Sequence, residues 1–227
     1  MAAPIAHIFC ALSLLNAGKL TVTDKCAFVL GTSFPDIRYL GVIERNETHD
    51  AHVTWTDVEH AKSDFEKGRL LHAYLDIKRE AYIVDNKLYD GMADTAYKTH
   101  ILKFFEDTLL WKKIKTWDKI CTYFDTILPE EQAFNIDPRH IHVWHSLLKK
   151  YVKQQPGPQD ISHFLAYLSN IKLKEKNIIK YVIKKIKSII INKIIYFKLS
   201  RDFKQLADNQ KLQQKIMHFY DNIAKEF

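Results

Sequence analysis

Apolar residues recur at three- and four-residue steps along most of this chain, and that spacing constrains its fold more than any other feature. The first such stretch begins at Pro4 and is ended by Gly18. Its apolar positions are Ile5, Ile8, Phe9, Leu12 and Leu15. Proline favours the first turn of a helix and glycine its end, so the stretch predicts a helix with one buried face. Only 6 glycines and 6 prolines occur in 227 residues, and the alternating runs typical of sheets are missing. We therefore predict an all-α fold.

The chain is long enough for one well-buried domain with an appendage. Hydrophobic residues make up 47% of the chain and charged residues 27%, which indicates a folded protein rather than a disordered one. The segment Pro156-Gly157-Pro158 is the clearest helix breaker. We predict a helical domain over residues 1–155 and a C-terminal helical extension over residues 159–227 that packs on it.

Cysteine usage and the N-terminal residues bear on the compartment. Cys10, Cys26 and Cys121 are odd in number and not closely spaced, which supports neither a disulfide framework nor a zinc ribbon. No Lys or Arg precedes the apolar residues 4–17, and a histidine interrupts them, unlike a signal peptide. No run approaches the roughly 20 apolar residues of a membrane span. We therefore expect a soluble, cytoplasmic protein, with peripheral membrane association as an option.

The segment from Gly31 to His52 gathers two arginines, two histidines and Asp36 in what we predict to be an irregular loop. Loops that carry such groups are often functional. Proline disfavours the α region for the residue before it, so Phe34 should be extended or in a turn, with Asp36 at its mouth. A carboxylate there is placed as a metal ligand would be. The alternative is that Asp36 caps the next turn and the histidines lie on the surface.

Two further candidates share one face of a helix. The sequence Ser-Asp-Phe-Glu matches a capping box and opens a helix predicted over residues 63–84. On it, His72 and Asp76 are four residues apart and therefore one turn apart on the same face. Such a pair suits one metal cluster, and the alternative is an ordinary hydrogen bond on the helix surface. His7, in the first helix, acts as a ligand only if it finds partners elsewhere, and otherwise is a hydrogen-bonded core histidine.

Residues 172–198 are rich in lysine and isoleucine. The apolar stripe consists of Ile179, Ile183, Ile186, Ile190, Ile194 and Phe197. This spacing predicts an amphipathic helix, which either packs on the core with a solvated lysine face or docks on an anionic membrane surface. The net charge of +7 favours anionic partners without choosing between phospholipid and polynucleotide. Recognisable nucleic-acid modules are absent, so nucleic acid is the less favoured partner.

Taken in order, these elements resemble the zinc-dependent phospholipase C family, which shares its all-helical fold with the S1/P1 nucleases. The resemblance covers about residues 4–110. It is carried by His7, by Gly-x-x-x-Pro-Asp-Ile from Gly31, by Arg-x-x-Thr-His from Arg45, and by His72-x-x-x-Asp76. It implies a multi-helix bundle of that family, with a basic C-terminal helical region added. By position it implies the metal ligands His7, Asp36, His49, His72 and Asp76, with Glu106 or Asp107, in a helix predicted over 93–111, to complete the set.

The resemblance implies one to three zinc ions, or another divalent metal. Secreted members of the family use the amine of a processed N-terminal tryptophan and a further histidine after the His-x-x-x-Asp helix. Here Met1 precedes His7 by six residues, and residues 77–99 contain no histidine. One metal, two metals, or a site without activity are therefore all compatible with the pattern.

Such a site would support metal-assisted hydrolysis. Imidazole nitrogen and carboxylate oxygen suit Zn²⁺, and two ions about 3.5 to 4 Å apart can clamp both ends of a phosphoryl displacement. The pKa of bound water falls towards about 7, so no Ser or Cys nucleophile is required. In this interpretation Asp36 is the catalytic residue that orients the attacking water, and Arg38 and Arg45 bind phosphate oxygens of the substrate.

Three functions follow as hypotheses. The first is a phospholipase C-like hydrolase that acts on a phospholipid or another phosphodiester. The second is a single-strand nuclease on the same site. The third is a non-catalytic helical module that binds an anionic membrane or a protein partner through residues 172–198.

Overall fold

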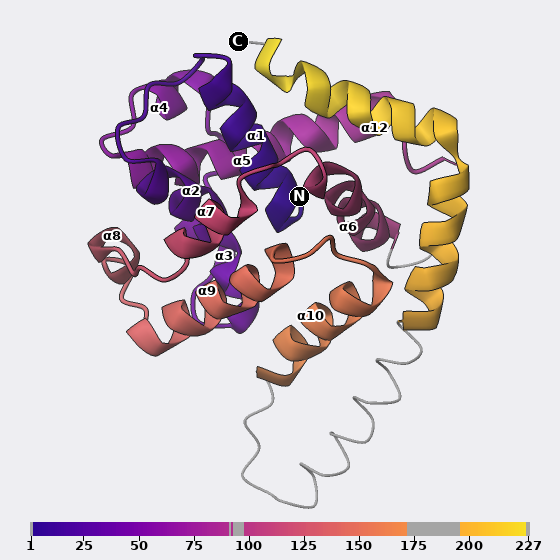
Figure 1. Ribbon diagram of the computed structural model, residues 1–227. Helices are drawn as coiled ribbons and strands as arrows, with labels where there is room; N and C mark the ends of the chain where they lie inside the picture. Colours follow the sequence, from indigo (N-terminus) through magenta and orange to yellow (C-terminus); the bar gives the residue numbers. More distant parts are fainter. Residues whose placement is uncertain (1, 91, 93–97, 172–195, 226–227) are drawn as a thin grey trace, which may run out of the picture.

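The computed structural model describes residues 2–90, 92, 98–171 and 196–225, and every regular element in this part is helical (Figure 1). In chain order the helices are α1 (Pro4–Asn16), α2 (Lys25–Ser33), η1 (Phe34–Leu40), α3 (Arg45–Thr48), α4 (Trp55–Glu59), α5 (Asp64–Asp85), α6 (Lys98–Trp111), α7 (Trp117–Tyr123), α8 (Pro129–Gln132), α9 (Pro138–Val152), α10 (Pro158–Ile171), α12 (Gln210–Asn222) and η2 (Ile223–Lys225). Residues 196–208 are also helical. The predicted all-α class is confirmed. None of the helices in the described ranges combines the length and the apolar character that a membrane span requires.

The contact between α2 and α5 organises the fold, and two glycines make it close. A Cβ atom at Gly31 would overlap the backbone of Phe65, and one at Gly68 would overlap backbone atoms of Phe28 and Thr32. Because neither position carries a side chain, the two helix backbones touch. This contact also places η1, which follows α2 directly, against α5.

Helix α1 has no capping side chain of its own. The carboxylate of Asp107, on α6, instead accepts hydrogen bonds from the backbone N–H groups of Ile5 and Ala6, at 3.2 and 2.8 Å. It also accepts one from the hydroxyl of Tyr151 at 3.0 Å. An acidic group from another helix therefore satisfies the first turn of α1 and suits its positive dipole end. This fixes the start of α1, and with it His7, against α6.

One hydrophobic core runs from the first helix to the last described one. Where the C-terminal helix α12 packs on this core, Glu106 on α6 accepts hydrogen bonds from Arg79 on α5 at 2.7 and 2.9 Å. It also accepts one from the hydroxyl of Tyr220 on α12 at 2.6 Å. Figure 1 shows α12 lying across this side of the molecule. The breaker at 156–158 forms the connection between α9 and α10, and the described residues beyond it share the core of residues 1–155.

The segment predicted as an irregular loop is largely helical. Helix α2 continues to Ser33, and the 3-10 helix η1 and the short α3 follow it. Phe34 has α-region angles, φ −66° and ψ −42°, although a proline follows it. Its side chain is buried, with the rings of Phe65 and Phe134 at centroid distances of 5.3 and 4.8 Å. We attribute the conformation to this packing, which outweighs the local preference.

Two predicted helices extend beyond the described residues. The helix predicted over 93–111 is observed from Lys98, and residues 93–97 lie outside the description. The amphipathic helix predicted over 172–198 falls almost wholly on residues 172–195, which also lie outside it. Its two interpretations, a core-packed helix and a membrane-docking one, stay predictions.

Candidate metal centre

Helix α5 supplies two of the candidate ligands on one face. His72 Nε2 lies 3.9 Å from Asp76 Oδ2, and both side chains are buried. His72 Nδ1 lies 2.8 Å from the carbonyl oxygen of Thr32 in α2. Because a carbonyl only accepts hydrogen bonds, Nδ1 carries the proton and the lone pair is on Nε2. The close contact between α2 and α5 thus fixes the tautomer and the orientation that a metal-binding imidazole requires.

Two more histidines join from other elements. His7 in α1 stacks on the ring of His72, with centroids 3.7 Å apart and 12° between the planes, and its Nε2 lies 3.4 Å from Asp76 Oδ1. His49, just after α3, meets the His72 ring edge-on at 4.9 Å and has its Nε2 3.9 Å from Asp76 Oδ2. The hydroxyl of Thr48 lies 3.0 Å from His49 Nδ1. Three imidazoles from three segments therefore surround one carboxylate.

Asp36 comes from the first turn of η1 and is 4% exposed. Asp36, His49 and His72 each offer a ligand atom within 4.8 Å of the other two. His7, His72 and Asp76 form a second group under the same limit. The structure therefore brings all five of these predicted ligands together, in two groups that share His72. We call this set the five-residue cluster.

Several buried atoms of the five-residue cluster have no hydrogen-bond partner in the described part of the chain. They include Nδ1 of His7, Nε2 of His49, Nε2 of His72 and Oδ1 of Asp36. A buried polar atom without a partner costs about 1 to 3 kcal/mol, so several at one point indicate a missing ligand. A divalent cation coordinates imidazole nitrogen and carboxylate oxygen together. The residues present therefore fit a metal ion.

Burial also sets the protonation of the five-residue cluster. It lowers the pKa of His72 well below its usual 6.5 and the pKa of His49 to about 3. Burial alone would raise the pKa of Asp76, but the contact with the His7 imidazole holds it well below 3.8. Neutral imidazoles at His49 and His72 and an ionised carboxylate at Asp76 are the forms that coordinate a cation.

Glu106 and Asp107 lie outside the five-residue cluster, and we remove both from the predicted ligand set. The oxygens of Glu106 accept hydrogen bonds from Arg79 and Tyr220, and those of Asp107 from α1 and Tyr151. Both carboxylates are buried. Their hydrogen bonds hold α1, α5 and α12 on α6, so the physical role of these two acids is structural.

The two arginines predicted to bind phosphate differ in their solvent exposure. Arg38 Nη2 lies 3.6 Å from Asp36 Oδ1, and its guanidinium sits 4.3 Å from the ring centroid of Tyr39. Its side chain is 16% exposed. Arg45 is exposed at the start of α3, the helix that leads into His49. Arg38 is thus held at the cluster, whereas Arg45 belongs to the surface beside it.

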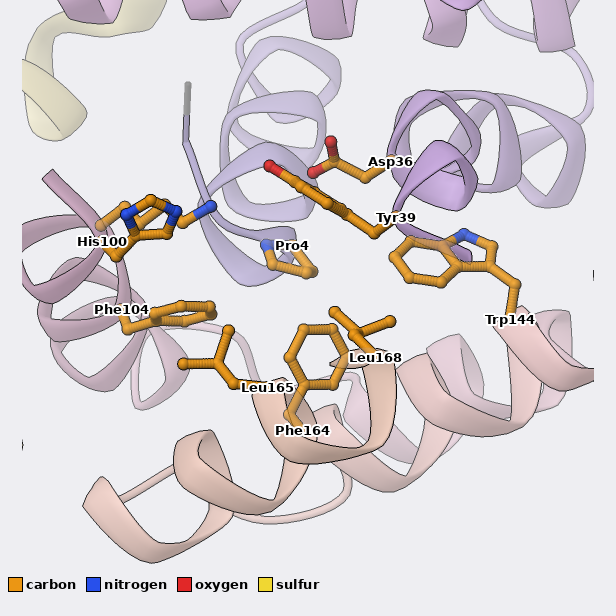
Figure 2. A pocket seen from close by; sticks show the side chains of 10 residues that line it. Pro4, Asp36, Tyr39, His100, Phe104, Trp144, Phe164, Leu165 and Leu168 are labelled. Atoms are coloured by element: carbon orange, nitrogen blue, oxygen red, sulfur yellow. The ribbon is translucent and has the colours of Figure 1, made fainter. Parts of the chain in front are cut away.

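A cavity of about 200 Å³ opens beside Asp36 (Figure 2). Its apolar and aromatic walls are Pro4, Tyr39, Phe104, Trp144, Phe164, Leu165 and Leu168. Figure 2 shows Phe164 and Leu168, from α10, reaching towards Pro4 and Tyr39 across the cavity. The other polar lining residues are His100 and Lys103. Burial raises the pKa of the Asp36 carboxyl, and the Lys103 ammonium is the strongest charge that opposes this shift.

The cavity was not predicted from the sequence, although one signal pointed to part of it. Tyr39 follows Asp36 by three residues, a spacing that keeps both on one side of a helical turn. Phe164 and Leu168 look like ordinary core positions of an amphipathic helix, and nothing in their pattern indicates a ligand-facing wall.

Comparison of the chain with protein-family models, with curated proteins and with solved structures finds no match. The assignment of this site as a candidate metal centre therefore rests on its own geometry.

Proposed function

We propose that this protein is a metal-dependent hydrolase of phosphodiesters, similar in its chemistry to the phospholipases C. The observation that carries the proposal is the convergence of three histidines and two aspartates, from four separate elements, at one buried point beside a cavity. Core packing alone gives no reason to bury several imidazole and carboxylate atoms without hydrogen-bond partners. A metal site next to an open cavity accounts for both features.

Zinc suits this donor set, and other divalent metals are compatible with it. When bound, zinc supplies a Lewis acid that yields hydroxide near neutral pH. His7, His49, His72 and Asp76 would hold the metal. Asp36 belongs both to the five-residue cluster and to the cavity wall, and we assign its carboxylate the role of orienting a water molecule towards a substrate there.

Two further features support a phosphodiester substrate. Arg38, beside Asp36, offers a planar guanidinium that suits phosphate oxygens. The apolar walls of the cavity exclude bulk water, which strengthens each electrostatic contact made inside it.

Metal analysis of the purified protein, followed by turnover assays, tests the proposal. We expect stoichiometric metal, and hydrolysis of bis(p-nitrophenyl) phosphate and phosphatidylcholine that a chelator abolishes and zinc restores. His72→Asn should lose metal and turnover, whereas the control His142→Asn, at an exposed position of α9, should keep both. A protein with neither bound metal nor chelator-sensitive turnover would refute the proposal.

The same preparation separates the alternatives. Cleavage of single-stranded DNA or RNA, without hydrolysis of lipid, would assign a nuclease. Absence of turnover on all these substrates, together with flotation on anionic liposomes that is lost on charge reversal of the lysines in residues 172–198, would assign a non-catalytic membrane-binding module.

A further inference from the structure

Lys103, on α6, is a buried cation that the five-residue cluster does not include. Its side chain is only 6% exposed. Among the residues that the structure describes, no carboxylate or carbonyl accepts a hydrogen bond from its ammonium group. The contacts of Lys103 Nζ are instead the ring faces of Phe104 and Tyr39, at 5.1 and 5.4 Å from the ring centroids.

Contacts with aromatic faces compensate only part of the hydration free energy that an ammonium group loses when it is buried. The carboxyl group of Asp36, on η1, is the strongest neighbouring charge, but the described part of the chain shows no hydrogen bond between it and the ammonium. The acidic groups on α6 do not supply the rest. Glu106 already accepts hydrogen bonds from Arg79 and Tyr220, and Asp107 caps α1. The three donors of Lys103 therefore stay available for an anion that enters from outside.

The position of Lys103 links this anion site to the candidate metal centre. Lys103 lines the same cavity of about 200 Å³ as Asp36, and Asp36 belongs to the five-residue cluster. The ammonium and the candidate metal centre therefore open into one space. The remaining walls of that space are mostly apolar, as Phe164 and Leu168 show in Figure 2.

We infer that Lys103 anchors an anionic phosphoryl oxygen of the substrate in the cavity beside Asp36, and that the apolar wall from α10 holds the substituent of the phosphoryl group. This inference rests on the proposed function and assigns Lys103 as a substrate-positioning residue. Because this wall is apolar, the cavity should favour phosphodiesters that carry an apolar or aromatic substituent.

The test compares Lys103→Met with Lys98→Met in the zinc-loaded protein. Lys98 starts the same helix and also lies near an aromatic ring, at 5.9 Å from the centroid of Tyr89, but it does not line the cavity. Loss of one hydrogen bond to a charged group should raise the KM for bis(p-nitrophenyl) phosphate about ten- to a hundredfold in Lys103→Met. The inhibition constant of inorganic phosphate should rise in parallel, while kcat changes by less than about threefold.

Zinc content is the readout that separates this inference from the proposed function. We expect Lys103→Met to bind as much zinc as the wild type, because Lys103 is not a ligand, and Lys98→Met to match the wild type in every assay. Unchanged KM and phosphate inhibition in a zinc-loaded Lys103→Met protein would overturn the inference and leave the hydrolase proposal intact.

If the wild type holds no metal and shows no chelator-sensitive turnover, the hydrolase proposal fails, and phosphate binding measured by ³¹P NMR decides the subsite. Binding that Lys103→Met abolishes and Lys98→Met retains would support the anion site. Equal binding by both variants, or none by the wild type, would overturn it. Lys103→Gln provides a second neutral variant, judged by the same outcomes, should Lys103→Met not fold.

Discussion

Replacing Gly68 by alanine should destabilise the fold and weaken metal binding together. The added methyl group would overlap the carbonyl oxygen of Phe28 and the backbone nitrogen of Thr32 in α2. Both are backbone atoms of a packed helix, so no side-chain rotation relieves the overlap and α2 must move away from α5. In an exposed helix the same substitution stabilises by up to about 1 kcal/mol, whereas overpacking costs about 1 to 3 kcal/mol or more. We therefore expect the free energy of unfolding to fall by at least about 1 to 2 kcal/mol.

The same movement should reach the metal centre. The carbonyl oxygen of Thr32 accepts the 2.8 Å hydrogen bond from Nδ1 that orients His72. Loss of such an outer hydrogen bond typically lowers metal affinity about 10- to 100-fold. A zinc titration of the folded Gly68→Ala protein should therefore show affinity reduced by roughly that factor.

Urea unfolding of the metal-free protein, followed by circular dichroism, measures the first effect, and isothermal titration with zinc measures the second. Gly157→Ala is the matched control, because a Cβ there would lie 3.7 Å from Asp160 Oδ2, an ordinary contact. Its stability should stay within about 0.5 kcal/mol of the wild type. A Gly68→Ala protein with wild-type stability and zinc affinity would refute the argument that the glycine contact positions His72.

Three further outcomes follow from the buried charges. Glu106→Gln leaves the guanidinium of Arg79 buried without its counter-ion, so urea unfolding should show a loss of about 3 to 5 kcal/mol, and zinc stoichiometry in the folded protein should not change. The lowered pKa values of His49 and His72 mean that below pH 6.5 the unfolded metal-free chain binds protons that the folded chain does not. These two histidines should therefore contribute a loss of about 1 to 3 kcal/mol of stability from pH 7.5 to 5.5, opposed by Asp36 and by Asp107, whose pKa burial raises to about 7. Because His72→Asn keeps both carboxyl groups, it should lose about 1 kcal/mol less than the wild type over this range, and an equal or larger loss would contradict this account. Chelation of zinc initially present at 100 times its Kd should remove about 2.7 kcal/mol of stability, seen as a lower Tm.

The parts of the site that local geometry determines could be predicted from the sequence. A capping box and a four-residue spacing place His72 and Asp76 on one face of α5 whatever the rest of the chain does. The convergence of His7, Asp36 and His49 on that face was implied by a resemblance and not by spacing. The position of Asp36 depends on the backbone contact between α2 and α5, and that of His7 on the capping of α1 by Asp107. A glycine in a sequence does not reveal what it packs against.

The acidic residues of α6 show where local reasoning fails. Glu106 and Asp107 carry the right chemistry for metal ligands, yet their hydrogen-bond partners decide their role. Tyr220 is 114 positions from Glu106, and Ile5 is 102 positions from Asp107. No helical period encodes separations of that size, so tertiary packing alone distinguishes a metal ligand from a capping carboxylate.

An anomalous difference map at the zinc absorption edge, from crystals grown with zinc, tests most directly whether the five-residue cluster binds a metal. We expect one or two peaks inside the five-residue cluster, with Nε2 of His72 at about 2.0 to 2.1 Å from a peak and an oxygen of Asp36 or Asp76 at about 2.0 to 2.2 Å. Zinc peaks confined to surface histidines such as His142, with none among the five residues, would contradict this expectation.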